Sequence, residues 1–326
     1  MKSPGLRLTV QLSLGLLAGF ALAPAAFSSD CSFQRTLQVS GSVNLEITTG
    51  AGDINVRTGD SSQVQICGHV KASNWFGGNM EEKVKRISAN PPIQQSGNDI
   101  RIGHIDDASL RHNISISYDV VAPATTRLQA HTGSGNQRVE GIQGQSELES
   151  GSGDLQVSGV GDTVRAETGS GNITLDQVKG NVRSKTGSGD IRATGISGGF
   201  EGSTGSGDVV LQQTSSGSVH VDTGSGGMEL RGVHGSLEAQ AGSGDIRAEG
   251  DPSGGWSLRT GSGEVRLQLA SSASYDLSAR TSSGSISVNQ PVTVQGTQNK
   301  HELHGKVHGG GVPVDIETGS GDIEVQ

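Results

Sequence analysis

One short motif in the sequence has residue types that could bind a ligand, and it occurs many times. In residues 184–195, Gly187 and Gly189 flank a serine, and Asp190 follows directly. Glycine-rich loops can hold phosphate through backbone N–H groups, and carboxylates can hold calcium. A phosphate loop opens a helix and works with a nearby Lys or Arg, whereas this motif leads into strand-like residues and recurs. We therefore predict tight corners, where glycine supplies positive φ and a side chain would clash.

The position after the second glycine of the motif is Asp or Asn in most copies. Asp190 and Asp208 are the calcium candidates, because carboxylates stacked about 4.8 Å apart could share an ion. Other copies have Gly or Ser there, which excludes an unbroken row of ions, and calcium-binding nonapeptide repeats space their glycines differently. We predict that these side chains cap the turn by accepting a backbone N–H. Calcium stays the alternative, and we otherwise expect no metal and no cofactor.

Carboxylates on adjacent turns could also resemble the acid pair of a retaining glycosidase. The separation of Asp190 and Asp208 would follow from the stacking itself, and no aromatic residue that could stack on a sugar is close in sequence. Ser, His and Asp occur without a nucleophile elbow or a Cys/His arrangement around them. We therefore predict no catalytic residue and no enzyme activity.

Three histidines and one aromatic pair are the remaining polar or contact candidates. His301, His304 and His308 could ligate zinc, but their loose spacing in a glycine-rich segment favours ordinary loop histidines. Trp75 and Phe76 are adjacent. They could form an exposed contact point, or they could plug the open end of a core.

The N-terminus predicts export. A short basic start and an apolar stretch end at the small residues 23–26, which is typical of a cleaved signal peptide over residues 1–26. Cys31 and Cys67 remain, and an even cysteine count in an exported chain favours a disulfide between them. We place the protein in the periplasm, at the cell surface or in the medium, with no stable membrane span in the mature chain. Without the signal peptide, 22 basic residues face 33 acidic ones, which argues against nucleic acid and anionic membranes as partners.

The glycine-rich motif recurs at nearly constant spacing, which decides the expected architecture. From Thr132 to Thr281 the steps between copies are 18, 18, 18, 18, 19, 18, 19 and 21 residues. A short fixed period over many copies predicts a solenoid, in which no turn can bury its apolar face alone. The copies begin at Thr49, Thr132, Ser150, Thr168, Thr186, Thr204, Thr223, Ala241, Thr260, Thr281 and Thr318.

Within each period, apolar residues alternate with polar ones in two strand-like runs. Stacking the copies in sequence order gives apolar columns, and the motif threonines point inward with them, where each hydroxyl can bond the corner backbone. We therefore predict an all-β, single-stack β-solenoid of about ten coils of 18–21 residues, with two main strands per coil. The columns are Leu155, Ile173, Ile191, Val209, Met228, Ile246, Val265 and Ile286; Val157, Leu175, Ala193, Leu211, Leu230, Ala248, Leu267 and Val288; and Val164, Val182, Phe200, Val219, Leu237, Trp256 and Leu277.

Residues 63–122 depart from this period. They contain strand-like runs at 63–70, 99–105 and 113–123, and residues 80–88 are compatible with a short helix. We divide the chain into a signal peptide (1–26), an N-terminal β region that caps the solenoid (27–131), and the repeat solenoid (132–326). Any local function is expected where the repeat fails, in residues 63–122 and 289–313.

These motifs resemble a bacterial family of β-strand-repeat domains of unknown function that is labelled "putative adhesin". The resemblance covers most of the mature chain: TTGAGDINV (48–56), SYDVVAP (117–123), the run of TGSGD copies, and VHGGGVPVDIETGSGDIEVQ (307–326). It implies a β-solenoid at an exported or surface location and brings no catalytic residues.

We interpret the chain as an exported, non-enzymatic, adhesin-like scaffold or interaction module of the cell envelope. Its partner would be an envelope polymer or a protein. The alternatives are a polysaccharide-binding or polysaccharide-processing β-helix protein and a calcium-stabilised surface repeat protein.

Overall fold

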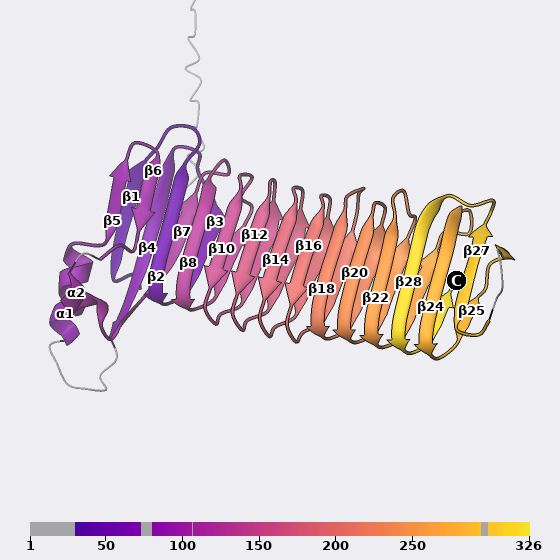
Figure 1. The fold of residues 1–326 in the computed structure, drawn as a ribbon. Helices are drawn as coiled ribbons and strands as arrows, with labels where there is room; N and C mark the ends of the chain where they lie inside the picture. The colour runs from indigo at the N-terminus through magenta and orange to yellow at the C-terminus, as the bar shows by residue number, and fades with distance from the viewer. Residues whose placement is uncertain (1–29, 73–79, 106, 295–298) are drawn as a thin grey trace, which may run out of the picture.

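The computed structural model describes residues 30–72, 80–105, 107–294 and 299–326. These residues form a long rod of two facing β-sheets, and two short helices lie at one end (Figure 1). The 14-stranded sheet, sheet A, contains β1 (Phe33–Gln38), β3 (Ile54–Thr58), β4 (Gln63–Ala72), β7 (Ile114–Ala122), β9 (Gln137–Glu140), β11 (Leu155–Val160), β13 (Ile173–Val178), β15 (Ile191–Ile196), β17 (Val209–Gln213), β19 (Met228–Val233), β21 (Ile246–Gly250), β23 (Val265–Leu269), β25 (Ile286–Val288) and β29 (Ile323–Val325).

The second sheet of the described residues, sheet B, has 15 strands. They are β2 (Asn44–Ala51), β5 (Ile93–Ser96), β6 (Asp99–Ile102), β8 (Arg127–Ser134), β10 (Ser146–Ser150), β12 (Val164–Thr168), β14 (Val182–Thr186), β16 (Phe200–Thr204), β18 (Val219–Ser225), β20 (Leu237–Ser243), β22 (Trp256–Ser262), β24 (Tyr275–Ser283), β26 (Val292–Val294), β27 (Glu302–Val307) and β28 (Val312–Ser320).

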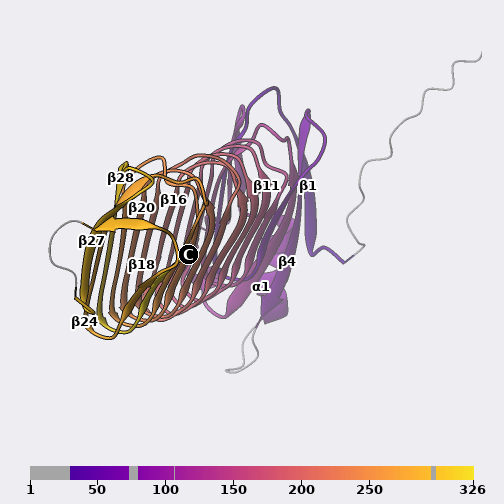
Figure 2. The ribbon, with the colours of Figure 1, turned by 90° about the vertical axis from the view of Figure 1, so that its right-hand side faces the viewer.

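The middle of the rod is the predicted β-solenoid. We call one strand of sheet A, the next strand of sheet B and the two corners between them a coil. Strands of successive coils pair in parallel and in register; for example, Leu155 pairs with Ile173, and Ile173 pairs with Ile191. Figure 2 shows the coils stacked one behind another. The expected fold class, with two strands per coil, is confirmed.

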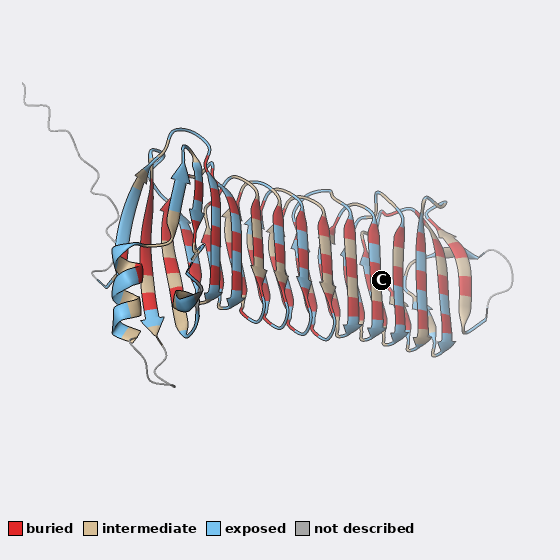
Figure 3. Ribbon diagram, turned by 60° about the vertical axis from the view of Figure 1, so that its left-hand side comes forward, coloured by how far each residue is buried: buried red, intermediate tan, exposed pale blue. Residues whose placement is uncertain are grey.

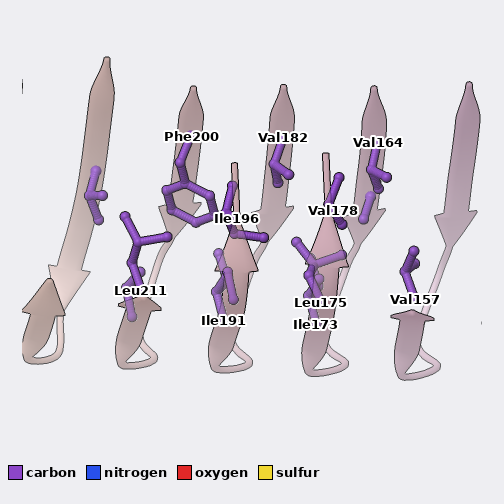
Figure 4. Close-up of a cluster of buried hydrophobic side chains, with 14 of the residues drawn as sticks. Val157, Val164, Ile173, Leu175, Val178, Val182, Ile191, Ile196, Phe200 and Leu211 are labelled. Atoms are coloured by element: carbon purple, nitrogen blue, oxygen red, sulfur yellow. The ribbon is translucent and has the colours of Figure 1, made fainter. Parts of the chain in front are cut away.

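The core is the thin layer between the two sheets. Buried and exposed residues alternate along the strands, so that red and blue bands run from coil to coil (Figure 3). Side chains of both sheets meet there, including Leu175 of sheet A and Phe200 of sheet B (Figure 4). A third buried position, represented by Val178 and Ile196, lies where the sheet A strand ends and lines the corner. The columns exist because every coil places the same apolar positions inward.

The order of coils is not the order of the sequence at one end of the rod. Strands β28 and β29 lie between the coil of β22 and β23 and the coil of β24 and β25. Thus Trp256 pairs with Val314 and Val265 pairs with Ile323, and the predicted steps from Trp256 to Leu277 and from Val265 to Ile286 are wrong. The physical reason is the hairpin strand β27, which runs antiparallel on the far edge of β24. After β27 the chain runs back, and its last strands, β28 and β29, are inserted between the two preceding coils.

The opposite end of the rod carries the predicted elaboration. The strand-like runs become β4, β6 and β7, and the expected helix is α1 (Met80–Ala89), which packs on β4. Strand β4 runs antiparallel to both β1 and β7, and β5 runs antiparallel to β6. The second helix is α2 (Ala108–Arg111). Neither helix in the described part of the chain is long and apolar enough to cross a membrane.

The first coil joins this end directly to the repeat. Strand β2 pairs with β8, and β3 pairs with β9. Both sheets therefore run without a break from the N-terminal region into the repeat solenoid, although the predicted boundary lies between residues 131 and 132. The division at this point stays a prediction.

Candidate functional site

At the Gly-Ser-Gly corners the backbone of one coil leaves no room for a side chain on the next coil. A Cβ atom placed on Gly189 would lie 2.0 Å from the carbonyl oxygen of Gly171, and one on Gly187 would lie 2.3 Å from that of Gly169. The expected positive φ is wrong for Gly187 and Gly189, but it is found at the second glycine of other copies, with φ between 143° and 158°. Those residues are Gly52, Gly244, Gly263, Gly284 and Gly321. Glycine is required because the backbone of the preceding coil occupies the space of a side chain. The glycines of the motif thus allow successive coils to stack at this corner.

The motif threonines point inward and join neighbouring corners. The Thr186 hydroxyl donates to the Gly171 carbonyl at 2.8 Å and accepts the N–H of Gly189 at 3.2 Å. Thr168 and Thr204 make the same pair of bonds one coil away on either side. The inward orientation and the bond to the corner backbone are confirmed. These hydroxyls serve the stack and are not available to a ligand on the surface.

The Asp and Asn side chains after the motif form a ladder along the rod. Oδ1 of Asn172 accepts the N–H of Asp190 at 2.9 Å, and Oδ1 of Asp190 accepts the N–H of Asp208 at 2.9 Å. The donor is the backbone of the next coil, where a turn within the same coil was expected. Gly227 donates its N–H to Asp208 but has no side chain to continue the ladder. Asp190 and Asp208 therefore each use one carboxylate oxygen to hold coils together.

At one position of this ladder, Asp322, the hydrogen bonds shift the pKa of the carboxyl group. At Asp322 the backbone N–H and then the hydroxyl of Ser285 donate to Oδ1, and these bonds lower the pKa of the carboxyl below its usual value. A carboxylate that accepts two hydrogen bonds is favoured over its protonated form. This end of the ladder is thus expected to be sensitive to acid.

The outer face of sheet B carries polar side chains in rows that follow the coils. Two side-chain contacts connect neighbouring coils along these rows: Arg183 lies 3.3 Å from Glu201, and His220 Nδ1 lies 3.2 Å from Glu238. Within strand β18, His220 Nε2 lies 2.9 Å from Asp222. All five side chains are 42–54% exposed, so each pair adds little stability. They lie in rows of mixed acidic, basic and amide side chains along the outer face of the sheet. The outward residues of β8 to β20 are Gln129, His131, Glu147, Glu149, Arg165, Glu167, Arg183, Lys185, Glu201, Ser203, His220, Asp222, Glu238 and Gln240.

A polar groove of about 690 Å³ lies at the N-terminal end of sheet B. Strands β2, β5, β6 and β8 line it with amide and charged side chains. Asn44 donates to Asp99 at 2.6 Å, whereas Arg127 has no side-chain partner among the described residues. The groove therefore offers hydrogen-bonding groups and one uncommitted cation. We call this surface, together with the rows on sheet B, the sheet B face.

The profile of the Toastrack DUF4097 family matches residues 161–326, which is half of the chain. The chain belongs to this family. None of the curated proteins compared with this Toastrack chain matches it significantly.

Several solved structures cover 90% of the Toastrack chain at low identity. A putative cell adhesion protein from Clostridium sporogenes is 11% identical, with a TM-score of 0.19 and 97% of that chain covered. A putative lipid binding protein from Parabacteroides distasonis is 13% identical, with a TM-score of 0.39 and 96% covered. A putative adhesin from Bacteroides fragilis is 11% identical, with a TM-score of 0.23 and 96% covered. At these TM-scores the likenesses carry no information about a ligand.

The two cysteines of the Toastrack chain lie at its elaborated end. Cys31 and Cys67 are joined by a disulfide with a Cα–Cα distance of 5.5 Å. His69 Nε2 lies 3.3 Å from Cys67 Sγ and 2.9 Å from Asp119 Oδ2. Cys31, Cys67 and His69 are the one group of three metal-type ligands that comes together in the described ranges, and its sulfurs are bonded to each other. The cluster is structural.

The structure does not bring the three candidate histidines together as a metal site. His304 Nε2 lies 3.1 Å from Glu302 Oε1, and His308 Nδ1 lies 2.9 Å from the Ala273 carbonyl. The buried Nδ1 of His301 has no hydrogen-bond partner in the part of the chain that is described. The three histidines therefore have different surroundings and do not form a zinc site. Trp75 and Phe76 lie outside the described residues, so their role stays a prediction.

Sequence reasoning missed the individual residues of the polar groove and of a second pocket near Tyr118. The signal that pointed to this region was the loss of the repeat period over residues 63–122. Both pockets contain residues of this segment.

Proposed function

We propose that this Toastrack protein is an exported, non-enzymatic, adhesin-like interaction rod of the cell envelope, and that the sheet B face binds its partner. The observation that carries this proposal is the register of polar side chains along that face. Parallel pairing places the polar side chains of successive coils next to each other in rows, as with Arg165 and Arg183 or Glu167 and Lys185. An extended partner therefore meets a charged or polar group about every 4.8 Å along each row.

Such a surface suits many weak contacts that act together. A single exposed ion pair or hydrogen bond contributes little, but linked contacts on one partner raise each other's effective concentration. The rigid stack keeps the contacts in line, so the entropy cost of ordering the protein side is already met in the free rod. A long polymer or an extended protein segment fits this geometry.

The groups that were considered for catalysis have structural roles in the described residues, which supports a non-enzymatic function. Asp190 and Asp208, the carboxylates compared with a glycosidase acid pair, each accept a backbone N–H of the next coil. The long outer faces of the two sheets are then the surfaces on which a partner can bind.

The test is a binding experiment with matched variants. Purified protein is incubated with isolated envelope polymers and with envelope protein extract, and the retained fraction is measured after cell fractionation has located the native protein. Replacing Arg127 and Gln129 by Ala on the sheet B face should lower retention several-fold. Replacing Arg192 and Gln212 by Ala on the outer face of sheet A serves as the control and should leave retention unchanged. Recovery of monomeric protein with nothing bound, or equal losses in both variants, would contradict the proposal.

A polysaccharide is the second candidate partner, and the polar groove favours it. Side-chain amides of Asn44, Gln94, Gln95 and Gln129 line the groove together with charged groups. Amides and charged side chains form the paired hydrogen bonds that sugar hydroxyls accept and donate. Soluble glycan fragments should compete with polymer binding if the partner is a polysaccharide, and they should have no effect if it is a protein.

A calcium-stabilised repeat protein is a further alternative, to be tested by thermal unfolding in calcium and in chelator. A large calcium-dependent shift would favour it, whereas equal unfolding temperatures would remove it.

A further inference from the structure

The disulfide at the elaborated end lies beside two groups that a disulfide does not need. His69 Nε2 is 3.3 Å from Cys67 Sγ and 2.9 Å from Asp119 Oδ2. Asp119 Oδ1 accepts a hydrogen bond from the Asn55 side chain at 2.8 Å, so both carboxylate oxygens are held in place. Thiolates, imidazoles and carboxylates are the side-chain groups that bind zinc in proteins. Their presence around one disulfide calls for an explanation beyond the cross-link.

Strand pairing brings these side chains to one face of sheet A. Cys67 and His69 are two residues apart on β4, so their side chains point to the same side of the sheet. Asp119 of β7 is the direct cross-strand partner of Cys67. On the other edge of β4, the N–H of Ser32 donates to the Gly68 carbonyl at 2.9 Å, which places Cys31 beside the same group. Backbone hydrogen bonds therefore keep these side chains together when the disulfide is open.

The distances in this cluster suit a single metal ion. The ligand atoms of Cys31, Cys67 and His69 all lie within 4.8 Å of one another. Zinc–sulfur bonds of about 2.3 Å and zinc–nitrogen bonds of about 2.0 Å place a sulfur and a nitrogen ligand about 3.5 Å apart in a tetrahedral site. The distance from His69 Nε2 to Cys67 Sγ is 3.3 Å. The side chains of His69 and Asp119 are 26% and 36% exposed, which gives an ion a path from solvent.

The redox state of the cysteines decides whether the cluster can bind a metal. In the oxidised protein the cluster is structural, because the metal ligand is a thiolate and not a disulfide sulfur. A dithiol reductant breaks the bond between Cys31 and Cys67: it gives two electrons and two protons to the cysteines and becomes a disulfide itself. Zinc then replaces the two thiol protons, which are released to solvent. Oxidation and zinc binding therefore exclude each other at this site.

We propose that the reduced protein binds one zinc ion through Cys31 Sγ, Cys67 Sγ and His69 Nε2, with Asp119 beside the fourth coordination position. The ion then joins the segment before β1 to β4 and replaces the cross-link that the disulfide supplies. This site belongs to sheet A and does not depend on the function proposed for the sheet B face.

The test compares the oxidised and reduced forms of the full-length mature protein. A phosphine, which becomes a phosphine oxide by taking oxygen from water, opens the disulfide and introduces no competing thiol. Zinc retained after dialysis is measured with a chromophoric chelator, and cobalt(II) serves as the spectroscopic probe. We expect one zinc ion per reduced chain and none on the oxidised chain, with thiolate-to-cobalt charge-transfer absorption in the reduced form only. Zinc should raise the unfolding temperature of the reduced form alone.

Three variants locate the ion. Asp119→Asn should weaken zinc binding by about tenfold, as expected for a group next to the ligands, and His69→Ala should weaken it more because it removes a ligand. His234→Ala, at an exposed histidine between β19 and β20, is the matched control and should bind zinc as wild type does. Far-ultraviolet circular dichroism of each reduced variant shows whether the sheets are intact.

Three results would overturn the proposal: equal zinc binding in both redox forms, no zinc on a reduced chain whose sheets are intact, or unchanged affinity in His69→Ala. If the chain unfolds on reduction, zinc should restore its circular dichroism spectrum, and a failure to restore it would equally count against the site.

Discussion

The close approach of coils at the glycine corners can be tested with two chemically identical substitutions, Gly187→Ala and Gly50→Ala. Both residues are the first glycine of the motif, and neither has a φ in the left-handed region. A Cβ on Gly187 would lie 2.3 Å from the carbonyl oxygen of Gly169, whereas a Cβ on Gly50 has no described atom within 4 Å. Only the substitution inside the stack should therefore disturb the structure.

The size of the effect follows from the geometry. Ordinary van der Waals contact begins near 3.4 Å, so the corner must open by about 1.1 Å from its 2.3 Å approach. The hydrogen bond from the Gly187 N–H to the Gly169 carbonyl, now 3.1 Å, would then lengthen beyond bonding range. Overpacking costs about 1–3 kcal/mol and the lost bond about 1 kcal/mol, so we expect a loss of about 2–4 kcal/mol.

Gly50→Ala should behave differently. Alanine at an unstrained glycine position reduces the entropy of the unfolded chain, so stability should stay within about 1 kcal/mol of wild type or rise slightly. Urea unfolding followed by far-ultraviolet circular dichroism compares the two variants with wild type. Equal losses in both variants, or no loss in Gly187→Ala, would refute steric stacking as the reason for glycine.

Three further outcomes are expected. Thr186→Val should lower the free energy of unfolding by about 1–3 kcal/mol, because it leaves buried corner groups unpaired, and Thr186→Ser should lose less, as measured by urea unfolding. The lowered pKa of Asp322 stabilises the fold above the unfolded pKa near 3.8, and this contribution is lost as the pH falls through the folded pKa. Unfolding temperatures between pH 5 and 2 should therefore fall less steeply in Asp322→Asn, and parallel curves would contradict this role of Ser285. Reduction of the Cys31–Cys67 bond, which closes a 36-residue separation, should cost roughly 3–4 kcal/mol, with a variant carrying serine at both positions as the comparison.

The repeat made most of the fold predictable. Positions such as Ile173 and Ile191 are apolar in all described copies but one, where Gln137 is buried instead, because each coil must bury the same face. Period and strand pattern therefore sufficed. The order of coils near residues 312–325 was not predictable in this way. Each copy offers the same edge to its neighbours, and the position of β28 depends on the antiparallel strand β27, which has no counterpart in the repeat.

The candidate sites were less predictable for a related reason. The role of Asp190 was inferred from residue type, but its hydrogen-bond donor belongs to the next coil and becomes evident only from the stacking distance. The same distance explains Gly187: the predicted side-chain clash is present, whereas the positive φ predicted from the local backbone is not. The second pocket, which borders Tyr118, could not be singled out, because it lies where β6 ends at Ile102, and the sequence pattern does not mark this difference in strand length.

The inserted coil has a mechanical consequence. Strand β28 is hydrogen-bonded to β22 on one side and to β24 on the other, and β29 is likewise held between β23 and β25. A tension applied to residues 312–326 would thus act on a segment clamped from both sides, and it cannot peel off strand by strand as an edge strand can. The load would have to shear four strand pairings together. A rod that tethers two surfaces under force would gain a firm anchor point at this end.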